Sequence, residues 1–228
     1  MPKPNTSSRT RNPRSANTNI KNFKIEWKNA NQKLAWITLQ KHDLVFLLGP
    51  AGTAKTFLAT AFAIREIVER RCKKIILTRP IVEAGGESLG YLPGTKEEKV
   101  YPYMLPFYDI IDQITDNNQT DKLMIMDRIR VSPLAYLRGC TFSDSICILD
   151  EAQNATKEQI KLFLTRFGMN SRMIITADPT QSDLKGKVAI MDVVKRLETV
   201  PNIGIIQFSP KDIVRHPLVS AILEKWED

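Results

Sequence analysis

The sequence predicts an α/β fold in which a parallel sheet is covered by helices on both faces. Short, unbroken apolar runs at 44–48, 146–149 and 173–176 have the composition of strands buried on both sides. These runs alternate with longer segments of helical periodicity, which is the order of strand–helix–strand units. The chain has 228 residues, enough for one domain of generous size with a substantial core.

The elements follow one another with recognisable stop signals. Strands are predicted at 44–48, 75–78, 146–149, 173–176 and 204–208. Helices are predicted at 32–40, 55–70, 96–129 (broken around 115–120), 132–139, 156–167, 187–198 and 211–226. Pro80 stops the second strand because proline lacks the N–H that a strand ladder needs, and Gly139 stops the helix at 132–139. The segment 83–94 is rich in glycine and charge, so we expect a loop there.

The octapeptide after the first strand is the strongest signal for function. It consists of Gly49, Pro50, Ala51, Gly52, Thr53, Ala54, Lys55 and Thr56. A glycine-containing loop between a buried strand and a helix, ending in Lys-Thr, is typical of P-loop nucleotidases, since its N–H groups can cradle phosphate oxygens. We expect Lys55 to reach the β and γ phosphates of ATP and the Thr56 hydroxyl to bind Mg²⁺. The alternative is a chance loop in an ordinary α/β domain.

Ala54 stands where the usual pattern has its second glycine. If the loop needs a positive φ there, alanine costs roughly 1 kcal/mol or slightly more. If the helix already begins at Ala54, alanine fits without strain. We expect the second case, because Gly52 remains available for the close approach to phosphate.

Two polar segments follow later strands. Asp150 ends an apolar strand, where it can hold Mg²⁺, and Glu151 can then orient and deprotonate the attacking water. After the strand at 173–176, Gln181 can touch the γ-phosphate or position the attacking water, and it can thereby report whether phosphate is present. Each segment also has an ordinary interpretation, a helix cap for the carboxylate pair and turn chemistry for Asp178-Pro179-Thr180. Their order after a phosphate loop favours the functional interpretation.

An ordered set of short motifs resembles the PhoH family. The set comprises residues 49–56, Thr78-Arg79-Pro80, Leu134-Ala135-Tyr136 with Arg138-Gly139, Asp150-Glu151-Ala152-Gln153-Asn154, Asp178-Pro179-Thr180-Gln181 and Val214-Arg215-His216-Pro217-Leu218-Val219. The resemblance covers about residues 30–225, and the family is similar to the first motor domain of superfamily-one helicases. Ala54 and Ala177 depart from it, because the family commonly has glycine at both positions.

The resemblance implies a RecA-like, ATP-binding domain with ATPase activity, in a family associated with RNA metabolism and phosphate starvation. It assigns Gln32 to the adenine edge, with an ordinary surface glutamine as the alternative. It places Arg215 in the closing helix as a contact to ATP, or to the γ-phosphate of a neighbouring subunit in a ring; a surface salt bridge is the alternative. It assigns Arg79 to single-stranded nucleic acid, and here a structural salt bridge is an equal alternative.

The net charge of +8 belongs mostly to the amino-terminal segment. Six of the 33 basic residues and none of the 25 acidic residues lie in 1–25, which leaves the remainder near +2. We expect residues 1–22 to be a disordered basic arm that wraps phosphate backbones or is merely solvated, and 23–228 to be a single RecA-like domain.

The sequence also indicates in which cellular compartment the protein is expected. No apolar run approaches the roughly 18 residues of a membrane span, and the amino terminus lacks the apolar stretch of a secretion signal. The cysteines Cys72, Cys140 and Cys147 have no metal-ligand spacing, so we expect reduced core residues. These observations predict a cytoplasmic protein without a membrane partner.

Two functions remain after these arguments. The first is a Mg²⁺-dependent ATPase that couples hydrolysis to remodelling of RNA or single-stranded DNA. Since only one motor domain is predicted, a homo-oligomeric ring such as a hexamer would supply the second half of each site. The second is an ATP-responsive binding module with little hydrolysis.

Deletion of residues 1–20 should weaken nucleic-acid affinity and flatten its dependence on salt, because fewer counterions would be released on binding. Titration of a labelled single-stranded oligonucleotide at several salt concentrations measures both quantities. An unaltered salt slope would remove the arm from the binding surface.

Overall fold

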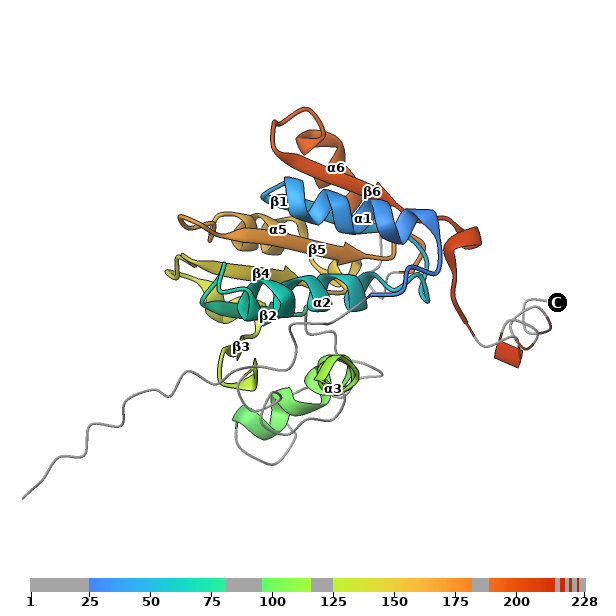
Figure 1. The fold of residues 1–228 in the computed structure, drawn as a ribbon. Helices are drawn as coiled ribbons and strands as arrows, with labels where there is room; N and C mark the ends of the chain where they lie inside the picture. The colour runs from blue at the N-terminus through green and yellow to red at the C-terminus, as the bar shows by residue number, and fades with distance from the viewer. Residues whose placement is uncertain are drawn as a thin grey trace, which may run out of the picture.

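The structure is a computed structural model that describes residues 25–80, 96–115, 125–181 and 189–215, together with positions 218, 219, 222 and 225 (Figure 1). The predicted arm at 1–22 and the predicted loop at 83–94 lie outside the described residues.

Six parallel strands form one sheet in the order β3-β2-β4-β5-β1-β6. The strands are β1 (Leu44–Leu48), β2 (Lys74–Thr78), β3 (Ile129–Val131), β4 (Ser145–Leu149), β5 (Arg172–Ala177) and β6 (Ile203–Gln207). The α-helices are α1 (Ala30–Lys41), α2 (Lys55–Val68), α3 (Lys96–Thr115), α5 (Lys157–Leu164) and α6 (Ala189–Leu197). Short 3₁₀ turns are η4 (Leu134–Leu137), η5 (Ala152–Asn154) and η6 (Pro210–Asp212). The predicted α/β architecture is confirmed.

The sheet is buried on both faces, which explains its unbroken apolar strands. In β1, Val45 and Leu47 pack with α1 and α2, whereas Phe46 and Leu48 pack with α5 and α6 on the other face. Figure 1 shows α1 and α2 in front of the sheet and α5 behind it. Alternate residues of one strand thus belong to two separate cores, as the two-residue period of a strand requires.

Two predicted elements differ from the structure. β3 lies inside the segment predicted to be helical to residue 129, and it pairs with β2 over three residues at the edge of the sheet. Such a short edge strand carries too little alternation to be read from its sequence. α3 itself ends at Thr115, where the sequence predicted a break.

The segment after β6 is the second difference. The helix predicted at 211–226 begins later than expected, because Lys211 and Asp212 belong to η6 and Ile213 is extended, with φ −67° and ψ 127°. The described positions 218, 219, 222 and 225 are helical, in agreement with the later part of the prediction. The Asp212 carboxylate accepts bonds from the Ser209 N–H at 2.8 Å and the Ser209 hydroxyl at 3.0 Å, which closes the turn locally. Val214 then donates its N–H to the Gly52 carbonyl at 2.9 Å instead of continuing a helix.

The three cysteine thiols are free. Burial raises the pKa of Cys72 and of Cys147 to about 12. Cys140 is only partly buried, so the expectation of a core position is wrong for this residue.

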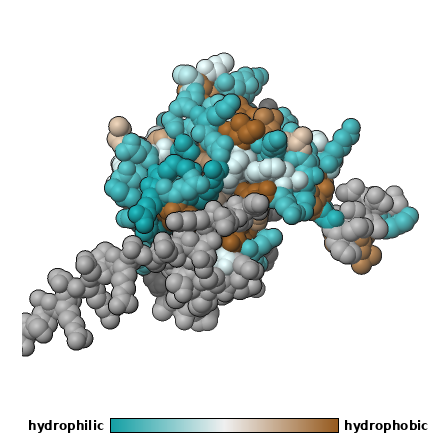
Figure 2. All heavy atoms as spheres, in the orientation of Figure 1, coloured by the Kyte–Doolittle hydropathy of each residue, from teal (hydrophilic) through white to brown (hydrophobic). Residues whose placement is uncertain are grey.

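Most of the described surface in Figure 2 is hydrophilic, and its apolar patches are separate. Within the described ranges, no helix combines the length and the apolar character needed to cross a membrane.

Candidate nucleotide-binding site

The loop at 49–56 begins where β1 ends, at the carboxyl edge of the sheet. Gly49 donates its N–H to the Ala177 carbonyl of β5 at 3.1 Å and has φ +145°. A Cβ at Gly49 would lie 2.6 Å from the Cβ of Phe208, so only glycine fits between β1 and the segment after β6. The loop therefore leaves the sheet in a direction set by tertiary packing.

Ala54 does not begin the helix, contrary to the expectation from the sequence. Its φ of 69° and ψ of 24° lie in the left-handed region, and α2 begins at Lys55. The Ala54 carbonyl accepts the first helical bond, from the Leu58 N–H at 2.9 Å, while the loop turns inward before it. Alanine therefore bears the strain, about 1 kcal/mol, that a glycine at this position would avoid.

The Lys55 amino group lies inside the curve of the loop. It donates to the carbonyls of Gly49 at 2.6 Å and Pro50 at 2.9 Å. Burial lowers the pKa of Lys55, and the negative charges of Asp178, Glu151 and Asp150 oppose this shift. The amino group thus stands among loop carbonyls and three carboxylates, at the place where a phosphate-binding lysine is required.

Asp150 lies at the end of β4 and is fully buried. Its Oδ1 accepts bonds from the hydroxyls of Thr56, at 2.7 Å, and Thr176. Its Oδ2 accepts bonds from Arg79, at 2.8 Å from Nε and 2.5 Å from Nη2. The structure thus brings together the two residues predicted to hold Mg²⁺ and pairs Arg79 with one of them.

The oxygen atoms of Thr56 and Asp150 fit the donor set that Mg²⁺ uses in nucleotide sites. The ion prefers oxygen ligands and is typically held by one or two carboxylates together with substrate phosphates. Thr56 is the second residue of α2, so its hydroxyl faces the phosphate loop from the same helix end that would meet the phosphates.

Glu151 is connected to the phosphate loop through a relay of two further residues. Glu151 has φ +56° and accepts a bond from the Gln153 side-chain amide. The side-chain oxygen of Gln153, Oε1, accepts a bond from the Asp178 N–H at 3.0 Å. The Asp178 carboxylate in turn accepts a bond from the Ala51 N–H at 2.9 Å. Both Gln153 and Asp178 are buried. Gln153 and Asp178 belong to the short motifs of the sequence, but the sequence predicts no role for either, because only the fold brings their partners together.

Gln181 follows β5 and is exposed. Its N–H donates to the Asp178 carbonyl at 3.2 Å, so it belongs to the turn that Asp178 also organises. Gln181 therefore follows, by three residues, the Asp178 whose carboxylate contacts the Ala51 N–H of the phosphate loop.

Gln32 lines a hollow of about 610 Å³ beside the loop. The hollow is lined by residues that include Ile25, Gln32, Gly52, Ala54, Phe57 and Val214. Gln32 is 4% exposed, and its side-chain oxygen accepts the Lys28 N–H at 2.9 Å. Its place inside a pocket next to the phosphate loop does not match the alternative of an ordinary surface glutamine.

Arg215 crosses the phosphate loop of its own chain. Its Nη2 donates to the Ala51 carbonyl at 2.9 Å, and a Cβ at Gly52 would lie 2.6 Å from its Nε. Arg215 is outside any helix, which corrects the predicted position in the closing helix. Gly52 is therefore needed here for the close approach of an arginine as well as for any phosphate.

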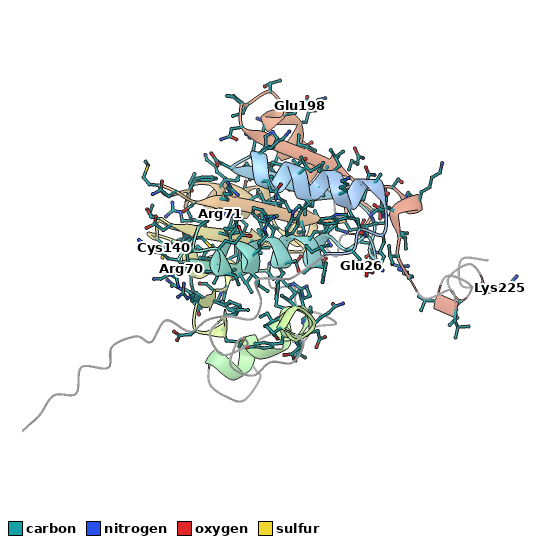
Figure 3. The ribbon with its side chains drawn as sticks, in the orientation of Figure 1. Glu26, Arg70, Arg71, Cys140, Glu198 and Lys225 are labelled. Carbon is teal, nitrogen blue, oxygen red and sulfur yellow. The ribbon has the colours of Figure 1, made fainter. Side chains whose placement is uncertain are left out.

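The segment that carries Arg215 is fastened to the start of α1. Asn29 donates to the Asp212 carbonyl at 3.1 Å, and Asn31 donates to the Asp212 carboxylate at 2.9 Å. In Figure 3, Glu26, which lines the hollow beside Gln32, lies toward the carboxyl edge of the sheet. Arg70, Arg71 and Cys140 lie toward the opposite edge.

A parallel sheet with this loop after β1 and a carboxylate pair after β4 defines a P-loop NTPase domain. The sequence pattern of the family described as PhoH-like protein matches residues 24–227. PhoH-like proteins of Bacillus subtilis and Mycobacterium tuberculosis are 46% and 45% identical, over 92% and 89% of this chain and 66% and 58% of their own lengths. The Escherichia coli protein PhoH is 36% identical over 82% of this chain and 54% of its own length. The chain therefore belongs to the PhoH-like protein family and spans 54–66% of these relatives.

Solved structures of helicases are similar in fold at low sequence identity. The UvsW helicase of bacteriophage T4 matches with a TM-score of 0.48 and 16% identity, over 83% of this chain and 62% of that chain. The Hef helicase domain of Pyrococcus furiosus matches with a TM-score of 0.45 and 13% identity, over 80% of this chain and 38% of that chain.

Ala54→Gly should have a free energy of unfolding about 1 kcal/mol above that of Ala51→Gly, because both variants gain unfolded-state entropy and only the glycine at 54 also relieves a strained left-handed φ. Urea denaturation followed by fluorescence measures this change. Ala51→Gly is the matched control in the same loop, since Ala51 is not among the residues of positive φ. The control should lower stability by roughly 0.5–1 kcal/mol through unfolded-state entropy. Equal losses in both variants would contradict the strain at Ala54.

Proposed function

We propose that this chain is a Mg²⁺-dependent ATPase whose hydrolysis is coupled to binding or remodelling of RNA or single-stranded DNA. The convergence of Lys55, Thr56 and Asp150 at the carboxyl edge of the sheet carries the proposal. These residues come from α2 and β4, and their side chains surround one loop whose backbone can bind phosphate.

In this proposal the triphosphate of ATP lies along residues 49–56. Loop N–H groups and the amino end of α2 attract the phosphate oxygens, and the Lys55 amino group turns from the loop carbonyls to the β and γ phosphates. Thr56 and Asp150 would hold Mg²⁺, which when bound would supply positive charge against the negative charge that develops on the phosphates during transfer. Gln32 and the hollow beside it bind the adenine.

Glu151 is the proposed base for hydrolysis. Its carboxylate accepts a proton from the attacking water, the water oxygen bonds to the γ-phosphorus, and the bond to the bridging oxygen of the β-phosphate breaks. Gln153 holds Glu151 by a hydrogen bond, and the relay through Asp178 links that base to the loop. Gln181, on the turn that Asp178 organises, senses the γ-phosphate.

Arg215 is proposed to stabilise phosphate charge in its own subunit. Its contact with the Ala51 carbonyl supports this role over one toward a neighbouring site. Arginines that stabilise the transition state in nucleotidases contribute on the order of 10³–10⁵ in rate.

The proposal also includes partners. The basic segment at 1–25 supports binding of a polyanion. A homo-oligomeric ring such as a hexamer is part of the same proposal. The cytoplasm, where ATP and RNA are both present, is the proposed location.

Lys55→Ala should abolish ATP binding, because the loop loses the amino group that donates to its Gly49 and Pro50 carbonyls and would bind the phosphates. Equilibrium binding of a fluorescent ATP analogue measures the loss. Lys41→Ala, at the exposed end of α1, is the matched control and should bind as the parent does. Near-native binding by Lys55→Ala would reject the phosphate loop.

Glu151→Gln should retain ATP binding and lower turnover by roughly 10²–10⁴, since the amide cannot accept the proton. Phosphate release with and without single-stranded RNA and DNA measures turnover and its coupling. Glu158→Gln, on the exposed face of α5, is the control. Unchanged release by Glu151→Gln would reject the base. A very slow parental rate that nucleic acid does not stimulate would favour the ATP-responsive binding module instead.

A further inference from the structure

We propose that Arg79 is a displaceable counter-ion of Asp150: Mg²⁺ competes with its guanidinium for this carboxylate and releases Arg79 when the nucleotide–metal complex binds. The inference rests on the proposed function and assigns Arg79 a positioning role that couples the metal site to α3.

Asp150 is buried at the end of β4 and needs a counter-charge. The residue has no exposed surface, and a carboxylate without water is destabilised unless hydrogen bonds and an opposite charge compensate it. Threonine hydroxyls satisfy Oδ1, and Arg79 satisfies Oδ2 through two N–H groups. In the described part of the chain, Arg79 is the cation at ion-pair distance from Asp150, and its own side chain is 19% exposed.

Mg²⁺ and the Arg79 guanidinium compete for the Asp150 carboxylate. Mg²⁺ requires direct or water-mediated contact with Asp150 and Thr56, which are already in contact with each other. Adding a divalent charge beside a bound guanidinium creates repulsion in a site from which water is largely excluded. The bond between Arg79 and Oδ2 must therefore weaken as the metal binds.

Arg79 also lies over an aromatic ring. Its guanidinium carbon lies 5.5 Å from the ring centre of Phe107, a residue of α3 that is 1% exposed. A cation over an aromatic ring is stabilised when Asp150 no longer holds it. Arg79 also follows β2 directly, so its movement acts on the end of that strand and on α3 together.

The sequence left two interpretations of Arg79 open, a structural salt bridge and a contact to single-stranded nucleic acid, and one side chain can serve both in turn. In the structure Arg79 is a salt-bridge donor, and its guanidinium is committed to Asp150. A guanidinium released by Mg²⁺ is a free cation with five N–H donors, which suits a phosphate group of a nucleic acid. On this view Arg79 becomes available to a polyanion only when the metal site is filled.

Mg²⁺ titration of Arg79→Gln tests the proposal. The measured quantity is the half-saturating Mg²⁺ concentration at a fixed concentration of a non-hydrolysable ATP analogue, followed by thermal shift and by fluorescence of a labelled analogue. We expect this concentration to fall roughly tenfold relative to the parent, because Mg²⁺ no longer displaces a charged hydrogen bond. We also expect a lower melting temperature without Mg²⁺ and a larger rise on its addition.

Arg71→Gln is the matched control. Arg71 donates from Nε to the buried Glu66 carboxylate at 2.9 Å, near the other end of α2 and the opposite edge of the sheet, so its loss removes an ion pair away from the loop. This variant should lose stability without any change in the Mg²⁺ response. Arg79→Lys keeps the charge with fewer donors and should give an intermediate half-saturating concentration, which keeps the test decisive if Arg79→Gln does not fold.

An unchanged or higher half-saturating Mg²⁺ concentration in the folded Arg79 variants would overturn the proposal and leave the ATPase untouched. Absence of Mg²⁺-dependent nucleotide binding in the parent protein would instead refute the proposed function itself. The two failures are therefore distinguishable in one set of titrations.

Discussion

A single buried negative charge, that of Asp150, organises the carboxyl edge of the sheet. Four parts of the chain meet on its two oxygens: Asp150 directly follows β4, α2 and β5 supply the threonine hydroxyls, and the chain after β2 supplies the arginine. Removing any one donor would leave a desolvated carboxylate partly uncompensated, and such groups are among the most destabilising in a protein interior. The same compensation that keeps the fold intact also orients the charge toward the phosphate loop.

Parallel strands make this convergence possible. Because all six strands run in one direction, the loops after β1, β2, β4 and β5 emerge along one edge, and β1 is in register with both β5 and β6. Residues distant in sequence, such as Ala51 and Asp178, then meet without long connections. The opposite edge carries structural ion pairs, in which Arg71 and Arg172 contact the buried Glu66.

The sequence was sufficient for the features that local pattern determines. Strands buried on both faces, the phosphate loop and Asp150 at a strand end follow from apolar runs and adjacent residues, and the structure has them where they were expected. Features set by tertiary contacts were not predictable. The left-handed Ala54 follows from how the loop enters α2, the non-helical 213–215 segment from a bond to Gly52, and the relay through Gln153 from partners 25 residues away. Arg79 could be given two interpretations because nothing in its neighbouring residues names its partner.

The bonds from Asn29 and Asn31 to Asp212 fasten the start of α1 to the segment bearing Arg215, and none of them belongs to the sheet. This clasp can open without separating any pair of strands. Opening it would free the segment that bears Arg215 from the start of α1, where Gln32 lies, whereas Ile25 and Trp27 pack against the core independently of these bonds. The contacts around the hollow are therefore separable from those that hold the sheet together.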